Sequence, residues 1–383
     1  MSVALADWMP VAEALAALNV RRQTLYAYVS RGLIRAQPDD DDPRRSLYSA
    51  HDIRALSGRR RGARRRSEVA AGAIAWGEPV LESAISTVRD GQLILRGKSI
   101  EALAATATLE DVACLLWGGE VGAAAPAKAI AKGATAKARA FAYLSVRAGV
   151  DPPSLGRPPA ALRAEAWLLL AGFADALIGE AGAGPLHRRI AKAWRLEARG
   201  AELVRRVLVL QSDHELNPST FAVRIAASTG ASLAGSVLAG LATLSGPLHG
   251  EAAARALAQL DQMLAASDPV AQARHMLARG ERFAGFGHPL YPEGDIRAKV
   301  LLKALRSRAA IARALKAMEN EVGRPPNCDA ALAAMTRELG LPDDAPYVLF
   351  ALSRMTGWLA HAMEQREANR IIRPRARYVG DLP

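Results

Sequence analysis

Residues 67–383 carry the feature that most restricts the fold, namely long stretches rich in Ala and Leu that Gly and Pro interrupt. Such stretches are typical of α-helices, and Gly and Pro are typical of the turns between them. Half of all residues are apolar and 23% are charged, which is the composition of a folded protein. The sequence therefore predicts a mainly α-helical body.

Two short segments depart from the helical pattern. Apolar residues alternate in Val80–Ser86 and in Asp90–Leu95, on either side of Arg89-Asp90-Gly91. Alternation around such a turn predicts a small β-hairpin. Segments 121–140 and 150–160, rich in Ala, Gly, Lys or Pro, are predicted to be loops.

Length and cysteine content exclude several classes of protein. A chain of 383 residues is long enough for more than one domain. Cys114 and Cys328 are the only cysteines, so neither a disulfide framework nor a cysteine-rich metal site can be built, and no bound metal is expected. The N-terminus has no basic region followed by an apolar core, and no apolar run is long enough to span a bilayer. We expect a cytoplasmic protein that does not bind membranes.

Residues 11–34 show the spacing of a helix-turn-helix. Apolar residues form one stripe before Asn19-Val20 and a second stripe after it, and Gly32 follows as a helix stop. The run Val20–Tyr26, the run Arg31–Ile34, and Tyr48 before His51-Asp-Ile53 resemble the MerR and excisionase families. The resemblance implies a winged helix-turn-helix domain over residues 1–58. It also implies that the second helix enters the major groove of DNA with the residues at its start, Arg21, Arg22, Gln23 and Thr24.

An arginine-rich segment, residues 59–71, follows as a predicted linker and contains much of the positive excess in a formal net charge of +12. Such a segment tracks phosphates through non-specific charge. Nucleic acid and the phosphates of CoA are both candidate anionic partners. A plain basic tether and a GC-rich coding sequence are the alternatives.

Three histidines lie in loops rich in Gly, Pro or polar residues, in the runs Asp213–Asn217, Ser245–Gly250 and Gly285–His288. A histidine on a tight loop can keep its imidazole available to a binding site, whereas one on an apolar helix face usually satisfies a core hydrogen bond. Each histidine alone is structural about as often as it is functional.

Together these runs, in this order, resemble the citrate synthase family, and the resemblance extends over nearly all of residues 72–383. Further matching runs are Leu81–Ser86, Thr108–Trp117, Asp295–Arg297, Pro326–Asp329, Arg354–Trp358 and Arg373–Arg375. The resemblance implies the all-α citrate-synthase fold, in which a small helical domain of roughly residues 255–350 is inserted into a large one.

The reaction of that family explains why these residue types are needed. An α-proton of an acyl thioester is weakly acidic, so its removal requires a positioned carboxylate and a donor that stabilises the enolate oxygen. The resemblance assigns Asp329 as the base, His249 as that donor, and His288 as the group that polarises the acceptor carbonyl.

The acceptor implied by the resemblance is oxaloacetate, and the donor is acetyl-CoA or propionyl-CoA. Arginine binds carboxylates through a planar fork of donors. Arg297, Arg354 and Arg373 match the family's carboxylate-binding positions, and His214 completes the pocket. The Arg373 position is supplied by the neighbouring subunit in the family, which implies a homodimer with shared sites. A CoA thioester is a co-substrate, and no permanently bound cofactor is implied.

Two positions depart from the family pattern. Glu251 follows Gly250 where relatives continue with Gly and an Asn-Glu pair. A carboxylate there could favour the cationic form of His249, or it could equally sit at a helix N-terminus and point away. Pro289 stands where many relatives have Arg. The histidines outside the three runs, His361 among them, are interpreted as structural.

Three hypotheses remain for the whole chain. The leading one is a dimeric citrate or 2-methylcitrate synthase. The second is a transcription regulator whose synthase-like body senses a CoA ester or a 2-oxo acid. The third is that residues 1–56 only mediate contacts with other proteins.

Overall fold

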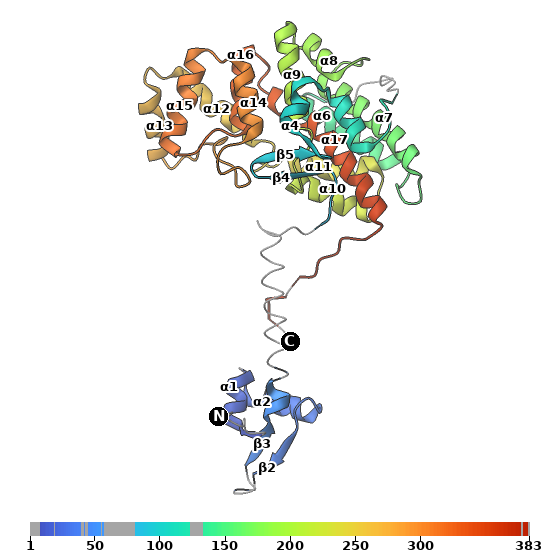
Figure 1. The fold of residues 1–383 in the computed structure, drawn as a ribbon, viewed down its shortest axis with the longest axis vertical. Helices are drawn as coiled ribbons and strands as arrows, with labels where there is room; N and C mark the ends of the chain where they lie inside the picture. The colour runs from blue at the N-terminus through green and yellow to red at the C-terminus, as the bar shows by residue number, and fades with distance from the viewer. Residues whose placement is uncertain are drawn as a thin grey trace. The chain divides into compact units, whose positions relative to one another are not determined.

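In a computed structural model the chain divides into two compact units, residues 1–82 and 83–383, and each is described by itself (Figure 1). The structure describes residues 8–18, 20–39, 42, 45–54, 56, 81–122, 133–376 and 378–381. The predicted arginine-rich linker, residues 59–71, lies outside them. Within the described residues no helix is both long and apolar enough to cross a membrane.

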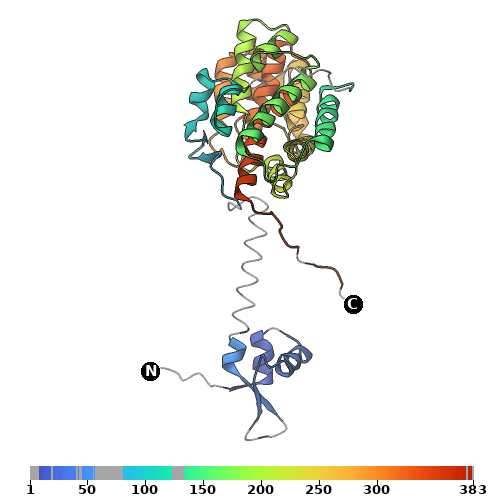
Figure 2. The same ribbon diagram turned by 90° about the vertical axis from the view of Figure 1, so that its right-hand side faces the viewer.

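The N-terminal unit contains two short helices where the apolar stripes predicted them, α1 (Val11–Leu18) and α2 (Arg22–Ser30). An antiparallel sheet of β1 (Trp8–Pro10), β3 (Ser46–Ser49) and β2 (Ala36–Pro38), in that order, accompanies them. Figure 2 shows β2 and β3 as a hairpin that extends away from the helices. A small core holds the elements together, and it consists of Ala14, Leu18, Leu25, Ile34, Tyr48 and Ile53.

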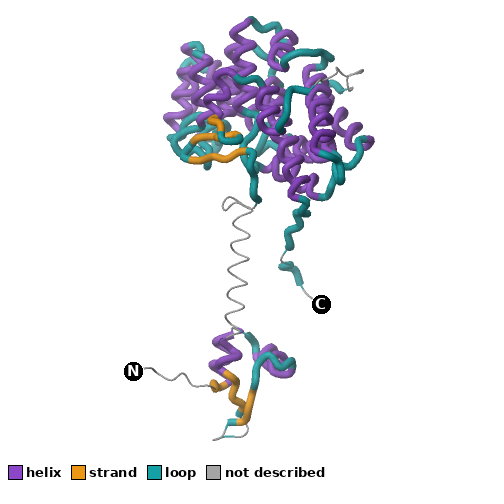
Figure 3. The backbone as a smooth tube through the Cα atoms, turned by 45° about the vertical axis from the view of Figure 1, so that its right-hand side comes forward, coloured by secondary structure: helices purple, strands orange, loops and turns teal. Residues whose placement is uncertain are grey.

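The larger unit is mainly helical, as the sequence predicted (Figure 3). It begins with an antiparallel sheet in the order β4 (Ser86–Arg89), β5 (Gln92–Leu95) and β6 (Lys98–Ser99). The helices that follow are α4 (Ile100–Thr106), α5 (Leu109–Trp117), α6 (Ala136–Val150), α7 (Pro159–Ile178), α8 (Leu186–Ala193), α9 (Ala198–Leu210), α10 (Pro218–Ser228), α11 (Leu233–Leu244), α12 (Ala252–Ala265), α13 (Pro269–Ala278), α14 (Ile296–Leu305), α15 (Ala309–Val322), α16 (Cys328–Leu339) and α17 (Ala345–Ala368).

The hairpin forms around Asp90-Gly91 as predicted, but its first strand starts at Ser86 and not at Val80, so that boundary was wrong. The residues just before Ser86 bond to a side chain and not to a neighbouring strand: the backbone N–H of Ala84 donates to the Glu364 carboxylate at 2.8 Å. The predicted loops were also too long. Helix α6 begins after Thr135, whose hydroxyl accepts from the backbone N–H of Ala138, and α7 begins at Pro159.

Helix α17 lies among the other helices of the body, and almost all of its residues are buried (Figure 1). A helix without a polar face can be stable only when neighbours cover it on every side. Helices α5, α7, α9, α10 and α11 all pack against α17. Residues on α17 can therefore reach several parts of the chain at once.

A close approach of α11 to α17 depends on Gly240. A Cβ at this position would lie 2.6 Å from a methyl group of Val223 and 3.1 Å from the Trp358 ring. We expect Gly240→Ala to destabilise the fold by about 2 kcal/mol, because the packed helices must move apart. Urea denaturation of the variant checks this result. Gly149→Ala is the matched control, because a Cβ there meets nothing within 4 Å.

Candidate active site

The turn between α9 and α10 presents His214. Asn217 fixes this turn: its carboxamide N–H donates to the His214 carbonyl at 3.2 Å, and its Oδ1 accepts from the backbone N–H of Thr220 at 3.1 Å and so caps α10. Glu215 adopts a left-handed φ of 48°, which bends the chain sharply after His214. The side chain of His214 is buried.

His214 and His288 lie close together although 74 residues separate them in the sequence. Their ring centroids are 5.1 Å apart, and His214 Nε2 is 2.9 Å from the Tyr291 hydroxyl. The backbone N–H of Leu290 donates to His288 Nδ1 at 3.2 Å. Since Nδ1 accepts this hydrogen bond, a neutral His288 ring carries its proton on Nε2.

His249 lies beyond the C-terminal end of α11 and contacts α17 and the start of α10. Its Nε2 is 2.9 Å from the Ser219 hydroxyl oxygen, which also accepts from the Trp358 indole N–H at 3.2 Å. The His249 ring meets the edge of Phe350 with a centroid separation of 5.9 Å. Two elements therefore orient this imidazole.

Two buried arginines lie beside the histidines. Arg297 donates to both oxygens of Asp295, at 2.9 and 2.7 Å, and its guanidinium lies 5.5 Å from the centre of the Tyr291 ring. Arg354 donates through Nε to the Gln211 carbonyl at 3.0 Å. Its buried Nη2 has no hydrogen-bond partner among the described residues. An unpaired buried guanidinium nitrogen is costly, and an anionic ligand could satisfy it.

Asp329 lies in the first turn of α16, but it does not cap this helix. Asn327 does so, because its Oδ1 accepts from the backbone N–H of Asp329 at 2.9 Å. Burial raises the pKa of Asp329 to about 6, against the opposing effect of Arg297. A carboxylate with such a pKa is more basic than an exposed one and is still ionised at pH 7.

The three histidines stay neutral at physiological pH. Burial and nearby arginines lower the pKa of His249 and of His288 to about 4, and they lower that of His214 well below its usual value. A neutral imidazole still has one N–H, which can donate a hydrogen bond to an oxygen that gains negative charge during a reaction. Burial likewise lowers the pKa of Arg354 to about 10, so its guanidinium remains charged.

The structure brings together six of the seven predicted residues, His214, His249, His288, Arg297, Arg354 and Asp329, through direct contacts or mutual electrostatic interactions. Arg373 lies apart, exposed in the extended segment after α17. Within the described part of the chain, its side chain makes no hydrogen bond or ion pair with the other six.

The structure shows the surroundings of Glu251 and Pro289, the two residues that depart from the family pattern. The Glu251 carboxylate forms an ion pair with Lys137 of α6, and burial and Arg354, rather than Glu251, set the lowered pKa of His249. Of the two alternatives for Glu251, the structure therefore supports the second: the residue lies at the N-terminus of α12, and its carboxylate pairs with Lys137 and not with His249. Pro289 is exposed in the turn after His288.

Several residues in the same contacts were missed from the sequence, notably Asp295, Tyr291, Ser219 and His361. The sequence predicted His361 to be structural. In the structure Arg354, Gly357 and His361 lie at i, i+3 and i+7, on one face of α17. No cluster of three or more His, Cys, Asp or Glu side chains suited to a metal occurs within the described ranges.

The chain is similar to known proteins over much of its length. A family model described as "Citrate synthase, C-terminal domain" matches residues 74–146 and 175–375. The citrate synthase of Haloferax volcanii is 36% identical over 192 residues, which are 47% of this chain and 51% of that protein. The 2-methylcitrate synthase 1 of Corynebacterium glutamicum is 32% identical over 188 residues, 46% and 49% of the two chains. The chain thus spans about half the length of these relatives.

A solved structure extends the likeness to the fold of the body. The citrate synthase of Thermoplasma acidophilum, in a ternary complex with carboxymethyl coenzyme A and oxaloacetate, superposes with a TM-score of 0.68 at 23% identity. The superposition covers 82% of this chain and 97% of that one. With the family model matching well over half of its residues, the chain belongs to the citrate synthase family.

Proposed function

We propose that the chain condenses acetyl-CoA or propionyl-CoA with oxaloacetate and releases CoA together with citrate or 2-methylcitrate. One observation carries the proposal: the Asp329 carboxyl, with its pKa raised to about 6, shares one buried cluster with three neutral histidines and two arginines. Such a cluster can remove a weakly acidic proton and stabilise the resulting oxyanion. Relatives named as citrate synthases and as 2-methylcitrate synthases support either acyl chain.

The first step removes a proton from the carbon next to the thioester carbonyl. Ionised Asp329 takes this proton, and the electron pair moves to the thioester oxygen. His249 donates a hydrogen bond to that oxygen. The Ser219 hydroxyl orients the imidazole: it lies 2.9 Å from His249 Nε2, donates to Asn217 Oδ1 at 2.7 Å and accepts from the Trp358 indole N–H at 3.2 Å.

The second step forms the carbon–carbon bond. His288 donates from Nε2 to the 2-oxo carbonyl of oxaloacetate, and the enol carbon attacks the carbonyl carbon. Water then cleaves the thioester and the CoA thiol leaves. Arg297 and Arg354 bind the carboxylates of oxaloacetate together with His214, and Arg373 reaches the site from a second copy in a cytoplasmic homodimer.

The domain organisation proposed for this activity follows the family. Helices α12–α16 form the small domain, at roughly residues 255–350, and they gather on one side of the body in Figure 1. The remainder of residues 72–383 forms the large domain. Residues from both domains, Asp329 and His214 for example, then enclose the substrates.

The test is CoA release by the purified full chain, followed with a thiol reagent. Oxaloacetate is supplied with acetyl-CoA or with propionyl-CoA. The expected result is turnover with at least one acyl-CoA, and its loss in Asp329→Ala. No release above background with either thioester, or equal release by the variant, would contradict the proposal.

The pH dependence of this reaction is a separate prediction. Asp329 acts as the base only when ionised, and its pKa is raised to about 6, whereas the pKa values of His249 and His288 are lowered to about 4. Activity should therefore rise with pH through about 6 and reach a plateau by about pH 7. Measuring kcat/KM between pH 5 and 8 in a buffer of constant ionic strength checks this, and an acid limb centred near pH 4 would contradict it.

For the N-terminal unit we propose a winged helix-turn-helix that binds DNA, in a regulator or beside the enzyme activity. The supporting observation is that Arg21, Arg22 and Gln23 are exposed where α2 starts, with Thr24 half-buried behind them. Exposed cations at the start of a second helix suit phosphates and base edges. The family match begins at residue 74, beyond the predicted domain of residues 1–58.

Binding of the full chain to genomic DNA fragments, with and without acetyl-CoA or oxaloacetate, tests this second proposal. The comparison chain lacks residues 1–66, and the matched variant is Arg21→Ala/Arg22→Ala. Loss of affinity in both is expected for DNA contact. Affinity unchanged in either would leave the unit a protein-contact module.

A further inference from the structure

Strand β4 holds the turn that carries His214 from both sides. The Ser86 hydroxyl donates to Asp213 Oδ2 and accepts from the backbone N–H of Glu215 at 2.9 Å. The Glu215 carboxylate in turn accepts from the Thr87 hydroxyl at 3.1 Å and from the backbone N–H of Val88. The residues before and after His214 are thus both tied to one short strand.

Helix α17 holds the same turn from another direction. Arg354 donates to the Gln211 carbonyl, and the backbone N–H of Gly357 donates to the Ser212 carbonyl at 3.0 Å. One turn further along the helix, His361 Nε2 lies 3.4 Å from Asp213 Oδ2. The close approach requires a glycine, because a Cβ on residue 357 would lie 2.2 Å from Asp213 Oδ1.

The neighbours of His361 determine which of its nitrogens carries the proton. Its Nδ1 is 3.1 Å from Nη1 of Arg224, and a guanidinium can only donate. Nδ1 therefore accepts, so Nε2 carries the hydrogen and donates it to Asp213. Arg224 is itself fixed by Gln365, which accepts from its Nε at 2.9 Å, and by an ion pair with Glu364.

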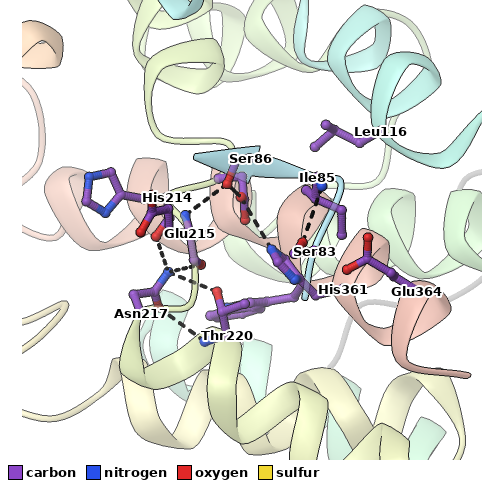
Figure 4. A network of polar contacts seen from close by, with 12 residues as sticks. Ser83, Ile85, Ser86, Leu116, His214, Glu215, Asn217, Thr220, His361 and Glu364 are labelled. Atoms are coloured by element: carbon purple, nitrogen blue, oxygen red, sulfur yellow. Dashed lines mark hydrogen bonds and ion pairs between the residues drawn. The ribbon is translucent and has the colours of Figure 1, made fainter. Parts of the chain in front are cut away.

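Asp213 is completely buried, and burial of an ionised carboxylate is costly unless it is paired. Burial alone would raise the pKa of Asp213, but His361, Arg354 and Ser86 together lower it. The carboxylate is therefore ionised at neutral pH and can accept both hydrogen bonds. Figure 4 shows Ser86 and His361 beside the turn, with the His214 ring directed away from both.

We propose that Asp213, held by Ser86 and by the Nε2–H of His361, is a positioning residue that fixes His214 in the oxaloacetate pocket. The inference rests on the proposed function, because that function assigns the pocket to His214. Asp213 and His361 act only through His214 and its turn. Their effect should therefore fall on binding of the 2-oxo acid and leave binding of the acyl-CoA unchanged.

The experiment compares His361→Leu with His361→Gln in the full chain. Leucine cannot donate to Asp213, whereas the glutamine carboxamide can donate from a position close to Nε2. We expect the KM for oxaloacetate to rise about tenfold in the leucine variant and to return to within about threefold in the glutamine variant, with the KM for acetyl-CoA unchanged. In His361→Leu/Asp213→Asn the two effects should not add, because both substitutions break one contact.

Ser353→Ala is the matched control, since Ser353 is a buried polar residue of α17 whose hydroxyl, among the described residues, donates only to the Leu349 carbonyl of its own helix. Its KM values should not change, and circular dichroism establishes that each variant is folded. Equal changes in both KM values, no change in His361→Leu, or failure of glutamine to restore the KM would overturn the proposal.

Calorimetric titration with oxaloacetate separates this proposal from the proposed function. If the wild-type chain releases no CoA, the proposed function fails, and the affinities for oxaloacetate then decide the positioning role. A tenfold loss in the leucine variant that glutamine restores still supports it. Equal affinities in the three proteins, or no binding by the wild type, overturn it.

Discussion

Replacing Asp329 by asparagine is expected to lower kcat by about 10³-fold and, at the same time, to stabilise the fold at pH 7. The carboxamide has nearly the shape of the carboxylate but cannot accept the α-proton. The carboxamide is also neutral, so it avoids the burial of a charge. Burial of that charge is what raises the pKa of Asp329. Loss of turnover and gain of stability in one variant would identify a carboxylate that is kept for chemistry and not for folding.

The sign of the stability effect depends on pH. Because the pKa of Asp329 is raised from 3.8 to about 6 in the folded chain, the native carboxyl is protonated below both values and costs nothing there. The cost grows as pH rises through about 6 and is complete above it, at about 1–3 kcal/mol for this half-buried group. Asparagine should therefore stabilise the chain at pH 7 and have little effect at pH 4.

Urea denaturation at both pH values and CoA release at pH 7 measure the two effects. Asp90→Asn is the matched control, since Asp90 has a left-handed φ that asparagine tolerates and a side chain that is 91% exposed. The expectation fails if Asp329→Asn keeps more than about a tenth of the turnover or is less stable than the wild type at pH 7.

Arg354→Met should raise the KM for oxaloacetate by about 100-fold, because it removes a charged donor pair from a buried carboxylate site. The Nη2 of Arg354 has no partner in the described part of the protein, while its Nε is engaged with the Gln211 carbonyl. The outer edge of the guanidinium therefore remains for the ligand. Arg354→Lys keeps the charge but not the fork, and we expect an intermediate loss.

Steady-state kinetics with oxaloacetate as the varied substrate checks this result. Arg274→Met provides the control, because Arg274 is an arginine with a side chain that is 69% exposed and paired with Glu321 at 3.0 Å. An unchanged KM in Arg354→Met, or an equal rise in the control, would exclude Arg354 as a carboxylate ligand.

Local sequence patterns predicted the elements of the fold better than the surroundings of the site. The helical body and the turn at Asp90-Gly91 follow from composition and alternation, which act over a few residues. The burial of Arg354 does not, because distant helices cover α17. Taken alone, Arg354 would be interpreted as an exposed charge and Asp329 as a helix cap. Only the ordered match to the citrate synthase family predicted that both residues belong to the site.

The start of β4 shows why local patterns were insufficient. Alternation continues back to Val80, yet the strand begins only at Ser86. Asp213 and Glu364 fix this boundary. Asp213 lies 127 positions from its partner Ser86 in β4, and Glu364 lies 280 positions from its partner Ala84 just before the strand. His361 was interpreted as structural because it lies outside the three histidine runs, and its partner Asp213 is 148 positions away. Side-chain contacts between residues so far apart in the chain leave no periodic pattern in the sequence.

The same contacts have a consequence for synthesis of the chain. The turn that carries His214 is fixed at one end by β4, among the first residues of the body, and at the other by α17, which is its last helix. Pairings between such distant segments form slowly, since a long loop must close before they contribute. A nascent chain therefore lacks an ordered His214 until α17 has left the ribosome. Until then, the apolar surfaces that α17 covers are exposed to aggregation and to chaperones.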